Sequence, residues 1–396
     1  MRRAGICVMA LPLAACGERA SAPAAIERDS AGIAIVEQVE PAAEPIVFTL
    51  ADAPDWVLQS DEANPDRVLH EVRGVVSMRD AIAVANTGAS QVWIYDAERD
   101  VLAVSGGPGD GPGEFSGMSY VHGLPGDSLL VTAGGRYDVL GPDGAYARSF
   151  RLDDDDRSST TVGVVGSALV IQRIRPGEPE QLREDVTRGT VDVLRFDLAG
   201  RFLDSLTTVP GWEAFNGLAS GFMIGNMPIP FGRGVQIEAS PRGVLTASSY
   251  DNEVRVYDAS SELERIIRNV APPGPPVMAE EVAALEERML EGWSGPMREA
   301  GERAYEAMPA ASTHPPFRAA YFGTDGSVWL GLRSALTDDE DIPAIVYGPD
   351  GMRLGGALLP SALRVTEISL DHVLGVWTDS LGVESVRSYN IERGGP

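Results

Sequence analysis

The sequence contains no lysine. All 32 of its basic residues are arginine, against 58 aspartates and glutamates, so the formal net charge at pH 7 is −26. A protein surface with this excess of negative charge repels the phosphate backbone of DNA and RNA. The composition therefore argues against nucleic acid as a partner.

Cysteine is nearly absent as well. The two cysteines, Cys7 and Cys16, both lie close to the N-terminus, so no disulfide framework is available to the body of the chain. The motif Gly-x-Ser-x-Gly, which marks the nucleophile of many hydrolases, does not occur. If Cys16 is modified, the mature chain also has no free thiol for nucleophilic catalysis. The sequence thus gives no sign of either of these two kinds of nucleophile.

The first 15 residues have the pattern of a secretory signal peptide. Arg2 and Arg3 precede a short apolar run at 6–13, which is too short to span a bilayer. The following residues, Leu13-Ala14-Ala15-Cys16, resemble the lipobox of bacterial lipoproteins. That resemblance implies cleavage before Cys16 and acylation of its thiol and new amino group, which is enough for stable anchoring. The alternative is an ordinary signal peptide with a chance cysteine.

The residue after Cys16 bears on where the protein is sorted. It is Gly17 and not aspartate, and in lipoproteins of bacteria with two membranes this favours the outer membrane. The resemblance thus implies a lipid-anchored protein of the bacterial cell envelope, in the periplasm or at the surface. Residues 16–28 are rich in Ala, Ser and Pro, and we expect them to form a flexible tether.

A short phrase recurs through the rest of the chain: an apolar run, an aromatic residue, then Asp or Gly and a turn. It occurs at 92–96, 194–197, 254–258 and 345–348, with weaker copies at 137–141 and 386–390. Each copy follows another short β-rich run. Six copies of such a unit predict a radial repeat, an all-β six-bladed β-propeller over residues 29–396. The last repeat has only three expected strands, at 363–369, 372–378 and 384–391. We expect the early strand 32–36 to complete it and so remove the open edges, and a further strand at 46–50.

Every long insertion is expected on one face of this propeller. The insertions are at 106–116, 153–159, 175–190, 208–231, 271–316 and 333–343, whereas the other face has tight Pro/Gly/Asp turns. Long loops on one end of a rigid scaffold are the usual place for binding. The insertion 271–316, between the fourth and fifth blades, predicts two amphipathic helices, one starting at Glu280 and Glu281 and one near Pro296. They either cover the channel mouth or pack on the edge of a blade.

The stretch from Gly106 to Phe115, GGPGDGPGEF, carries a family resemblance. Together with the segments 29–33, 123–130 and 373–377, it resembles the bacterial six-bladed β-propeller lipoproteins related to NHL-repeat proteins. The resemblance covers most of the mature chain and implies the propeller fold. Propellers of this type range from binding scaffolds to lactonase-like and lyase-like enzymes, so the resemblance leaves the function open.

Four arginines are candidate ligand-binding residues. They lie at or just before the starts of expected inner strands, on the insertion face: Arg73, Arg233, Arg318 and Arg364. Guanidinium groups that converge there would hold a carboxylate or a phosphate. The alternative is that each pairs with a neighbouring carboxylate such as Glu71 or Glu367. Trp212 and Phe215 are two further candidates, which either stack on a ligand or pack beneath their own loop.

Evidence for a metal site is weak. His70, His122 and His314 lie at or near inner strands, and a related lyase-type propeller holds a metal with histidines, but no paired spacing is present. The acidic runs 153–156 and 338–341 lack the spacing of an EF-hand loop. We therefore expect no cofactor, with a divalent metal as the alternative.

Two functions remain open at this stage. The first is a membrane-anchored binding or scaffold module for a small anionic ligand or a protein partner. The second is a metal-dependent hydrolase or lyase of the lactonase-like propeller type. The sequence does not decide whether the protein is an enzyme.

Overall fold

A computed structural model describes residues 25–39, 46–60, 68–153, 159–177, 185–219, 222–332 and 341–394. The predicted signal peptide, Cys16, residues 16–24 of the predicted tether and most of both acidic runs lie outside these ranges. The described chain is mostly β-strand, as predicted.

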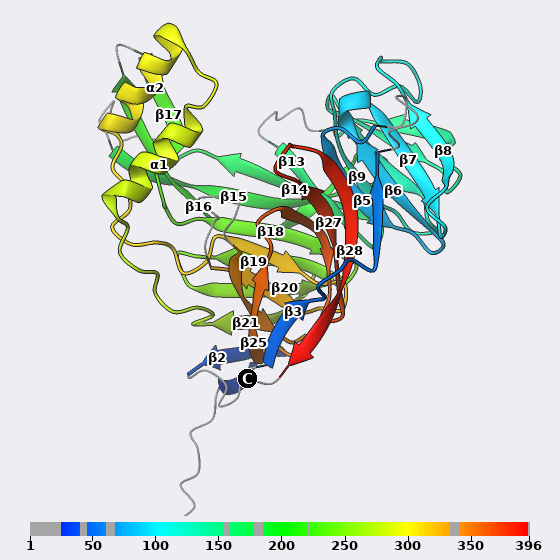
Figure 1. The fold of residues 1–396 in the computed structure, drawn as a ribbon. Coiled ribbons are helices and arrows are strands. Elements are labelled where there is room, and N and C mark those ends of the chain that lie inside the picture. The colour runs from blue at the N-terminus through cyan, green and yellow to red at the C-terminus, as the bar shows by residue number, and fades with distance from the viewer. Residues whose placement is uncertain are drawn as a thin grey trace, which may run out of the picture.

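Antiparallel meanders repeat along the chain (Figure 1). The first consists of β5 (Val72–Ser77), β6 (Ala81–Asn86), β7 (Gln91–Asp96) and β8 (Val101–Gly106). The later meanders contain the strands β9 (Met118–Gly123), β10 (Leu129–Ala133), β11 (Arg136–Leu140), β12 (Tyr146–Phe150), β13 (Ser159–Val165), β14 (Ala168–Arg175), β15 (Asp185–Asp197), β16 (Phe202–Ala219), β17 (Phe222–Pro228), β18 (Val235–Ser240), β19 (Gly243–Ser248), β20 (Glu253–Asp258), β21 (Leu263–Arg268), β22 (Ala319–Phe322), β23 (Val328–Gly331), β24 (Ile342–Tyr347), β25 (Arg353–Leu359), β26 (Leu363–Ile368), β27 (His372–Thr378) and β28 (Glu384–Gly394).

The first strands of the meanders lie beside one another. β5 contacts β9, β13 contacts β9 and β18, β18 contacts β22, and β26 contacts β5. All six of these first strands contribute residues to one central cavity. Sheets that radiate from a shared cavity, each with its first strand innermost, have the arrangement of a β-propeller.

The repeated phrase of the sequence forms the third strand of each sheet. In β7, the residues Val92, Trp93, Ile94 and Tyr95 are all buried. In β8, the outermost strand of the same sheet, half-buried and exposed residues alternate. A strand covered on both faces tolerates a continuous apolar run, whereas an edge strand alternates, which is why the third strand carries the clearest signal.

The N-terminal strands differ from the prediction. The strand β2 (Ile33–Gln38) pairs in parallel with β21 and antiparallel with β1 (Ala25–Ser30). The expectation that residues 32–36 complete the last repeat is therefore wrong. The strand that pairs with the free edge of β28 is β4 (Trp56–Gln59). Its Leu58 is buried among Trp93, Val376 and other core residues, which favours this pairing. Because β1 begins at Ala25, the last residues of the predicted tether are also strand.

The expected strand at 46–50 is confirmed as β3 (Ile46–Leu50). It pairs in parallel with β25 and antiparallel with the end of β28, and so joins two meanders into one sheet. Its Phe48 is buried against Trp329, with the ring centroids 5.5 Å apart.

Two of the expected long loops are largely strand. The described part of 175–190 continues β15, and the segment 208–231 forms most of β16 together with β17. Val186 and Thr187 in the first segment and Trp212 and Phe215 in the second are residue types that favour strands, and strands that pair with each other satisfy their backbone groups without the rest of the sheet. The hairpin therefore extends beyond its sheet.

The predicted helices are present between β21 and β22, as α1 (Ala279–Met289) and α2 (Gly295–Ala307). Figure 1 shows both helices next to β17 at the end of the long hairpin, and α2 contacts β16. Met308, just after α2, is buried with Phe215 and Ile229. No residue of 271–316 lines the central cavity. The insertion thus packs on the extended hairpin, the second of the two placements considered.

The start of α1 is fixed by polar contacts. The backbone N–H of Met278 donates to Glu281 Oε2 at 2.8 Å, and Nε2 of the buried His314 lies 3.1 Å from the same oxygen.

Among the residues that the structure describes, no helix has the length and apolar composition needed to cross a membrane.

Candidate functional site

The candidate site is the central cavity. It has a volume of about 690 Å³ and is lined by β5, β9, β13, β18, β22 and β26 with the turns that follow them. Small-molecule sites in proteins commonly have volumes of this size. Glycines on the inner strands hold the strands close together: a Cβ on Gly163 would lie 2.9 Å from Ala239 Cβ.

The inner strands give the cavity a direction. Gly74 on β5 lies next to Val121 on β9, and Gly123 lies next to Val76, so these two strands run in parallel. Because successive strands of each meander are antiparallel, its first strand starts on the face where the long insertions emerge and ends at a tight turn. Distance from the end of the strand is therefore a measure of depth below that face.

Two arginines occupy the end of the cavity that is nearer the long insertions. Arg73 and Arg364 each lie four residues before the last residues of β5 and β26, Ser77 and Ile368. Arg364 Nη1 donates to Arg73 O at 3.4 Å, and Nη2 donates to Val72 O. Arg73 is exposed and makes no ion pair with any residue in the described part of the chain. One guanidinium is thus fixed by the backbone and the other remains available.

The two positive charges are close enough to affect each other. Burial lowers the pKa of Arg364, and the charge of Arg73 lowers it further, whereas Glu384 and Tyr120 raise it. Glu384 itself accepts the backbone N–H of Val72 at 2.8 Å. Guanidinium groups that converge at one end of a cavity attract a carboxylate or a phosphate.

Two neutral titratable groups lie deeper. Glu238 is two residues before the last residue of β18, Ser240, and His122 is one residue before the last residue of β9, Gly123. Burial raises the pKa of Glu238 to about 8 and lowers the pKa of His122 to about 4. At neutral pH the carboxyl is therefore mostly protonated and the imidazole is uncharged. His122 Nε2 is buried, and no residue in the described ranges forms a hydrogen bond with it.

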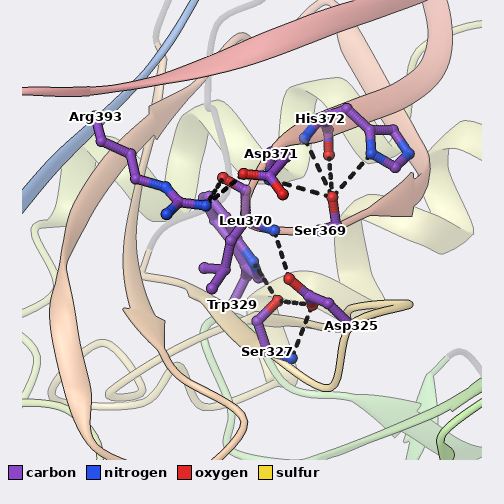
Figure 2. Close-up of polar contacts among 8 residues, drawn as sticks. All are labelled: Asp325, Ser327, Trp329, Ser369, Leu370, Asp371, His372 and Arg393. Carbon is purple, nitrogen blue, oxygen red and sulfur yellow. Dashed lines mark hydrogen bonds and ion pairs between the residues drawn. The ribbon is translucent and has the colours of Figure 1, made fainter.

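A polar cluster supports the tight-turn end (Figure 2). Asp325 accepts hydrogen bonds from the Ser327 backbone and side chain, at 3.0 and 2.6 Å, and from the Leu370 N–H at 2.8 Å. Trp329 Nε1 donates to Ser327 Oγ at 3.1 Å. These contacts tie the turn after β22 to the turn after β26. They satisfy one another, so the cluster is structural.

His372 belongs to the same cluster and not to the cavity. Its Nδ1 lies 2.8 Å from Ser369 Oγ, and its Nε2 lies 3.1 Å from Glu367 Oε1. The hydrogen bond with Glu367 raises the pKa of His372. Glu367 lines the cavity but is occupied by this contact.

The structure does not bring the four predicted arginines together. Arg73 and Arg364 line the cavity, whereas Arg233 and Arg318 do not. The backbone N–H of Arg233 donates to Glu213 Oε2, and the backbone N–H of Glu213 donates to Arg233 O. Arg318 lies over the ring of Phe231, 5.6 Å from its centroid, and burial lowers its pKa.

The aromatic candidates are packed into the protein. Phe215 is buried with Ile229 and Met308. Trp212 lies against Gly234, where a Cβ would come within 2.1 Å of its ring. Both residues therefore pack within the protein, and neither lines the cavity.

The three histidines considered for a metal lie apart. His122 lines the cavity, His70 is exposed and lies against Gly88, and His314 contacts Glu281 and the ring of Phe231. Within the described ranges no group of three or more His, Cys, Asp or Glu residues could hold a metal ion.

Sequence reasoning missed Glu238 and Tyr120. Glu238 is the only charged residue in the strand VQIEAS. An isolated carboxylate in an expected inner strand is the signal that would have found it. Tyr120 is in an inner strand that also carries His122, with the two ring centroids 6.2 Å apart.

No protein-family model matches the chain, and no curated protein is similar to it in sequence. Solved structures with a similar course of the chain include a putative exported protein of Bacteroides fragilis, at 10% identity and a TM-score of 0.47, covering 88% of this chain and 99% of that one. A DUF4221-family protein of Bacteroides vulgatus has 9% identity and a TM-score of 0.48, with the same coverage. Streptogramin B lyase has 10% identity and a TM-score of 0.36, covering 87% of each chain. At these values the similarities give no basis for transferring a ligand or an activity.

Proposed function

We propose that the protein is a six-bladed β-propeller lipoprotein of the bacterial cell envelope that binds a small anionic ligand in its central cavity. Six blades correspond to the six inner strands that line the cavity. β4 completes the last blade, and the helical insertion lies between the fourth and fifth. The lipid on Cys16 anchors the molecule to the outer membrane, and residues 16–24 connect the lipid to the propeller.

The observation that carries the binding function is the pair Arg73 and Arg364 at one end of the cavity. The chain as a whole has a formal net charge of −26, yet two arginines lie side by side on the cavity lining. The Arg73 guanidinium forms no ion pair with a described residue. The hydrogen bonds from Arg364 to the backbone of β5 are structural, but they do not account for Arg73, whose like charge repels that of Arg364. Ligand binding gives Arg73 a physical reason to be there.

The test is a melting experiment on the full-length chain purified in detergent. A ligand that binds only the folded state raises the melting temperature, and a site filled well above its dissociation constant shifts it by about 2 °C or more. Succinate or phosphate should raise the melting temperature of the wild type but not that of Arg73→Ala.

The matched control is Arg79→Ala. Arg79 lies in the turn that follows β5 and does not line the cavity. Its side chain is 80% exposed, and its Nε lies 3.9 Å from Asp127 Oδ2. Its loss should leave the ligand-induced shift unchanged. Equal shifts in the wild type and Arg73→Ala would show that the cavity arginines bind no anion.

The second candidate function is a hydrolase or lyase of the lactonase-like propeller type. What favours it is the pair Glu238 and His122, two titratable groups in one cavity whose pKa values move in opposite directions. The alternative function requires a divalent metal, so the purified chain should be analysed for zinc and calcium. A stoichiometric metal lost on His122→Asn would favour the enzyme over the binding module.

A further inference from the structure

The chemistry of the cavity changes along its axis. Arg73 and Arg364 lie four residues before the ends of their strands, whereas Glu238 lies two residues and His122 one residue before theirs. At about 3.3 Å per strand residue, the charged and neutral groups are separated by about 7–10 Å along the cavity. One end of the cavity therefore carries positive charge, and the deeper part carries neutral polar groups.

The deeper groups lack protein partners. No described residue makes a hydrogen bond or an ion pair with the Glu238 carboxyl, although it lines the cavity. His122 Nε2 is buried without a partner on the same lining. A carboxyl without partners on a cavity lining and a buried imidazole nitrogen without partners nearby are both costly beside an apolar occupant, so they favour a polar one.

We infer that the ligand is a hydroxylated carboxylic acid, bound with its carboxylate at Arg73 and Arg364 and its hydroxyl groups at Glu238 and His122. This inference rests on the proposed function and adds the neutral half of the ligand. A protonated carboxyl both donates and accepts a hydrogen bond, and a neutral imidazole does the same through its two nitrogens. A hydroxyl group is the matching partner, since it too donates and accepts.

The alternative occupants fit less well. A phosphate or a dicarboxylate can bind at the arginine end, but its second negative charge would find no cation at Glu238 and His122. A purely aliphatic acid would leave both deep groups without partners, which costs more than a lost hydrogen bond is worth.

The titratable groups around Glu238 come from several strands. Tyr321 lies near it, and burial together with the Glu238 charge raises the pKa of Tyr321 to about 12. The other titratable groups on the cavity lining are Arg73, Tyr120, His122, Arg364 and Glu367. The neighbouring strands β19 and β13 present Leu245 and Gly163, which do not titrate.

The experiment compares three probes by calorimetry on the full-length chain. Gluconate has a carboxylate and hydroxyl groups, hexanoate has the carboxylate on a chain of equal length without hydroxyl groups, and sorbitol has the hydroxyl groups alone. Gluconate should bind about tenfold or more tightly than hexanoate, since even one well-formed buried hydrogen bond contributes about that much. Sorbitol should bind least, because it lacks the charge.

Two variants of Glu238 make the test specific. Glu238→Leu should abolish the preference for gluconate over hexanoate, whereas Glu238→Gln, which keeps a neutral donor and acceptor, should retain most of it. Melting curves show whether each variant is folded. Raising the pH above 8 should weaken gluconate binding to the wild type but not to Glu238→Gln, because only the wild type gains a negative charge beside the ligand.

The outcomes separate this inference from the function it rests on. If gluconate and hexanoate bind equally and both depend on Arg73, the cavity is an anion site and the hydroxyl preference is wrong. If neither acid binds, or binding does not depend on Arg73, the anion-binding function itself is wrong.

Discussion

Glu238 is a carboxyl whose folded environment favours its neutral form. Its pKa rises from 4.5 to about 8 because the surrounding strands remove it from water. In the unfolded chain the proton leaves at lower pH, so the protein loses stability as pH rises from about 4.5 to about 8. The cavity keeps some contact with water, which reduces the size of the effect.

The first prediction follows from that linkage. Glu238→Gln should be more stable than the wild type at pH 9, by about 1–3 kcal/mol, and should show no such gain at pH 4, where the carboxyl is protonated in both states. Urea unfolding at the two pH values measures the difference.

His122 provides the internal control, because its dependence has the opposite sign. Burial lowers its pKa from 6.5 to about 4, so the wild type loses stability as pH falls through that interval. His122→Asn should therefore gain relative stability at acid pH and not at pH 9. The same pH profile for both variants would contradict the assigned charge states.

The site could be predicted from the sequence only in part. Arg73 and Arg364 were found because they lie near the starts of inner strands, and position in a repeat is a local signal. Arg233 and Arg318 share that signal, but the course of the chain just before β18 and β22 directs them elsewhere. Glu238 was missed because its importance comes from burial, which depends on five other strands and not on its own neighbours.

At the scale of elements, β4 completes the sheet of β26, β27 and β28 through a four-residue strand. Its Leu58 is 4% exposed and packs in the core with Trp93, whereas Val57 on the same strand is 38% exposed. The two residues face opposite sides of the strand, so they form a matched pair.

The second prediction uses that pair. Leu58→Ala should destabilise the protein by about 2–5 kcal/mol, because it removes buried methyl groups and leaves a cavity at the closing strand. Val57→Ala should change the unfolding free energy by about 0.5 kcal/mol or less. Denaturant titration measures both. Equal effects would mean that β4 does not close the propeller in solution.

The helical insertion is attached through Glu281. This residue accepts the N–H of Met278 at the start of α1 and contacts the buried His314. Its neighbour Glu280 is exposed in the same turn, and no described residue forms an ion pair with it.

The third prediction concerns that attachment. Glu281→Ala should cost about 0.5–2 kcal/mol at the start of the helix and increase hydrogen exchange in 279–289, whereas Glu280→Ala should have little effect. Exchange in the inner strands should be unchanged in both. Faster exchange throughout the propeller would show that the insertion is part of the main cooperative unit.

The strands of the meanders were predictable, but the pairing of the N-terminal strands was not. Apolar runs bounded by turn residues locate a strand locally. Pairing partners are set by contacts between distant residues, and segments 33–38, 46–50 and 56–59 are three short β-rich runs with similar local patterns. Only the packing of Leu58 and Phe48 in different cores distinguishes them. Likewise, the segments 185–190 and 208–219 resemble loops until they pair with each other.

At the scale of the whole molecule, the proposed lipid anchor would determine where the cavity is available to ligands. The fourth prediction is that Cys16→Ser abolishes acylation and moves the protein from the membrane fraction to the soluble periplasm, because the anchor supplies the membrane affinity. Fractionation with labelling by a fatty acid analogue measures both effects. Membrane association that persists without acylation would rule out the lipid as the anchor.

The central claim is that the propeller binds an acid in the cavity that its six inner strands share. An experimental structure of the protein with gluconate tests it most directly. The account predicts the carboxylate within hydrogen-bond distance of Arg73 or Arg364, with the hydroxyl groups extending toward Glu238, and β4 paired with β28 at the closure. Gluconate bound only outside this cavity, or a cavity that holds solvent alone at saturating gluconate, would contradict it.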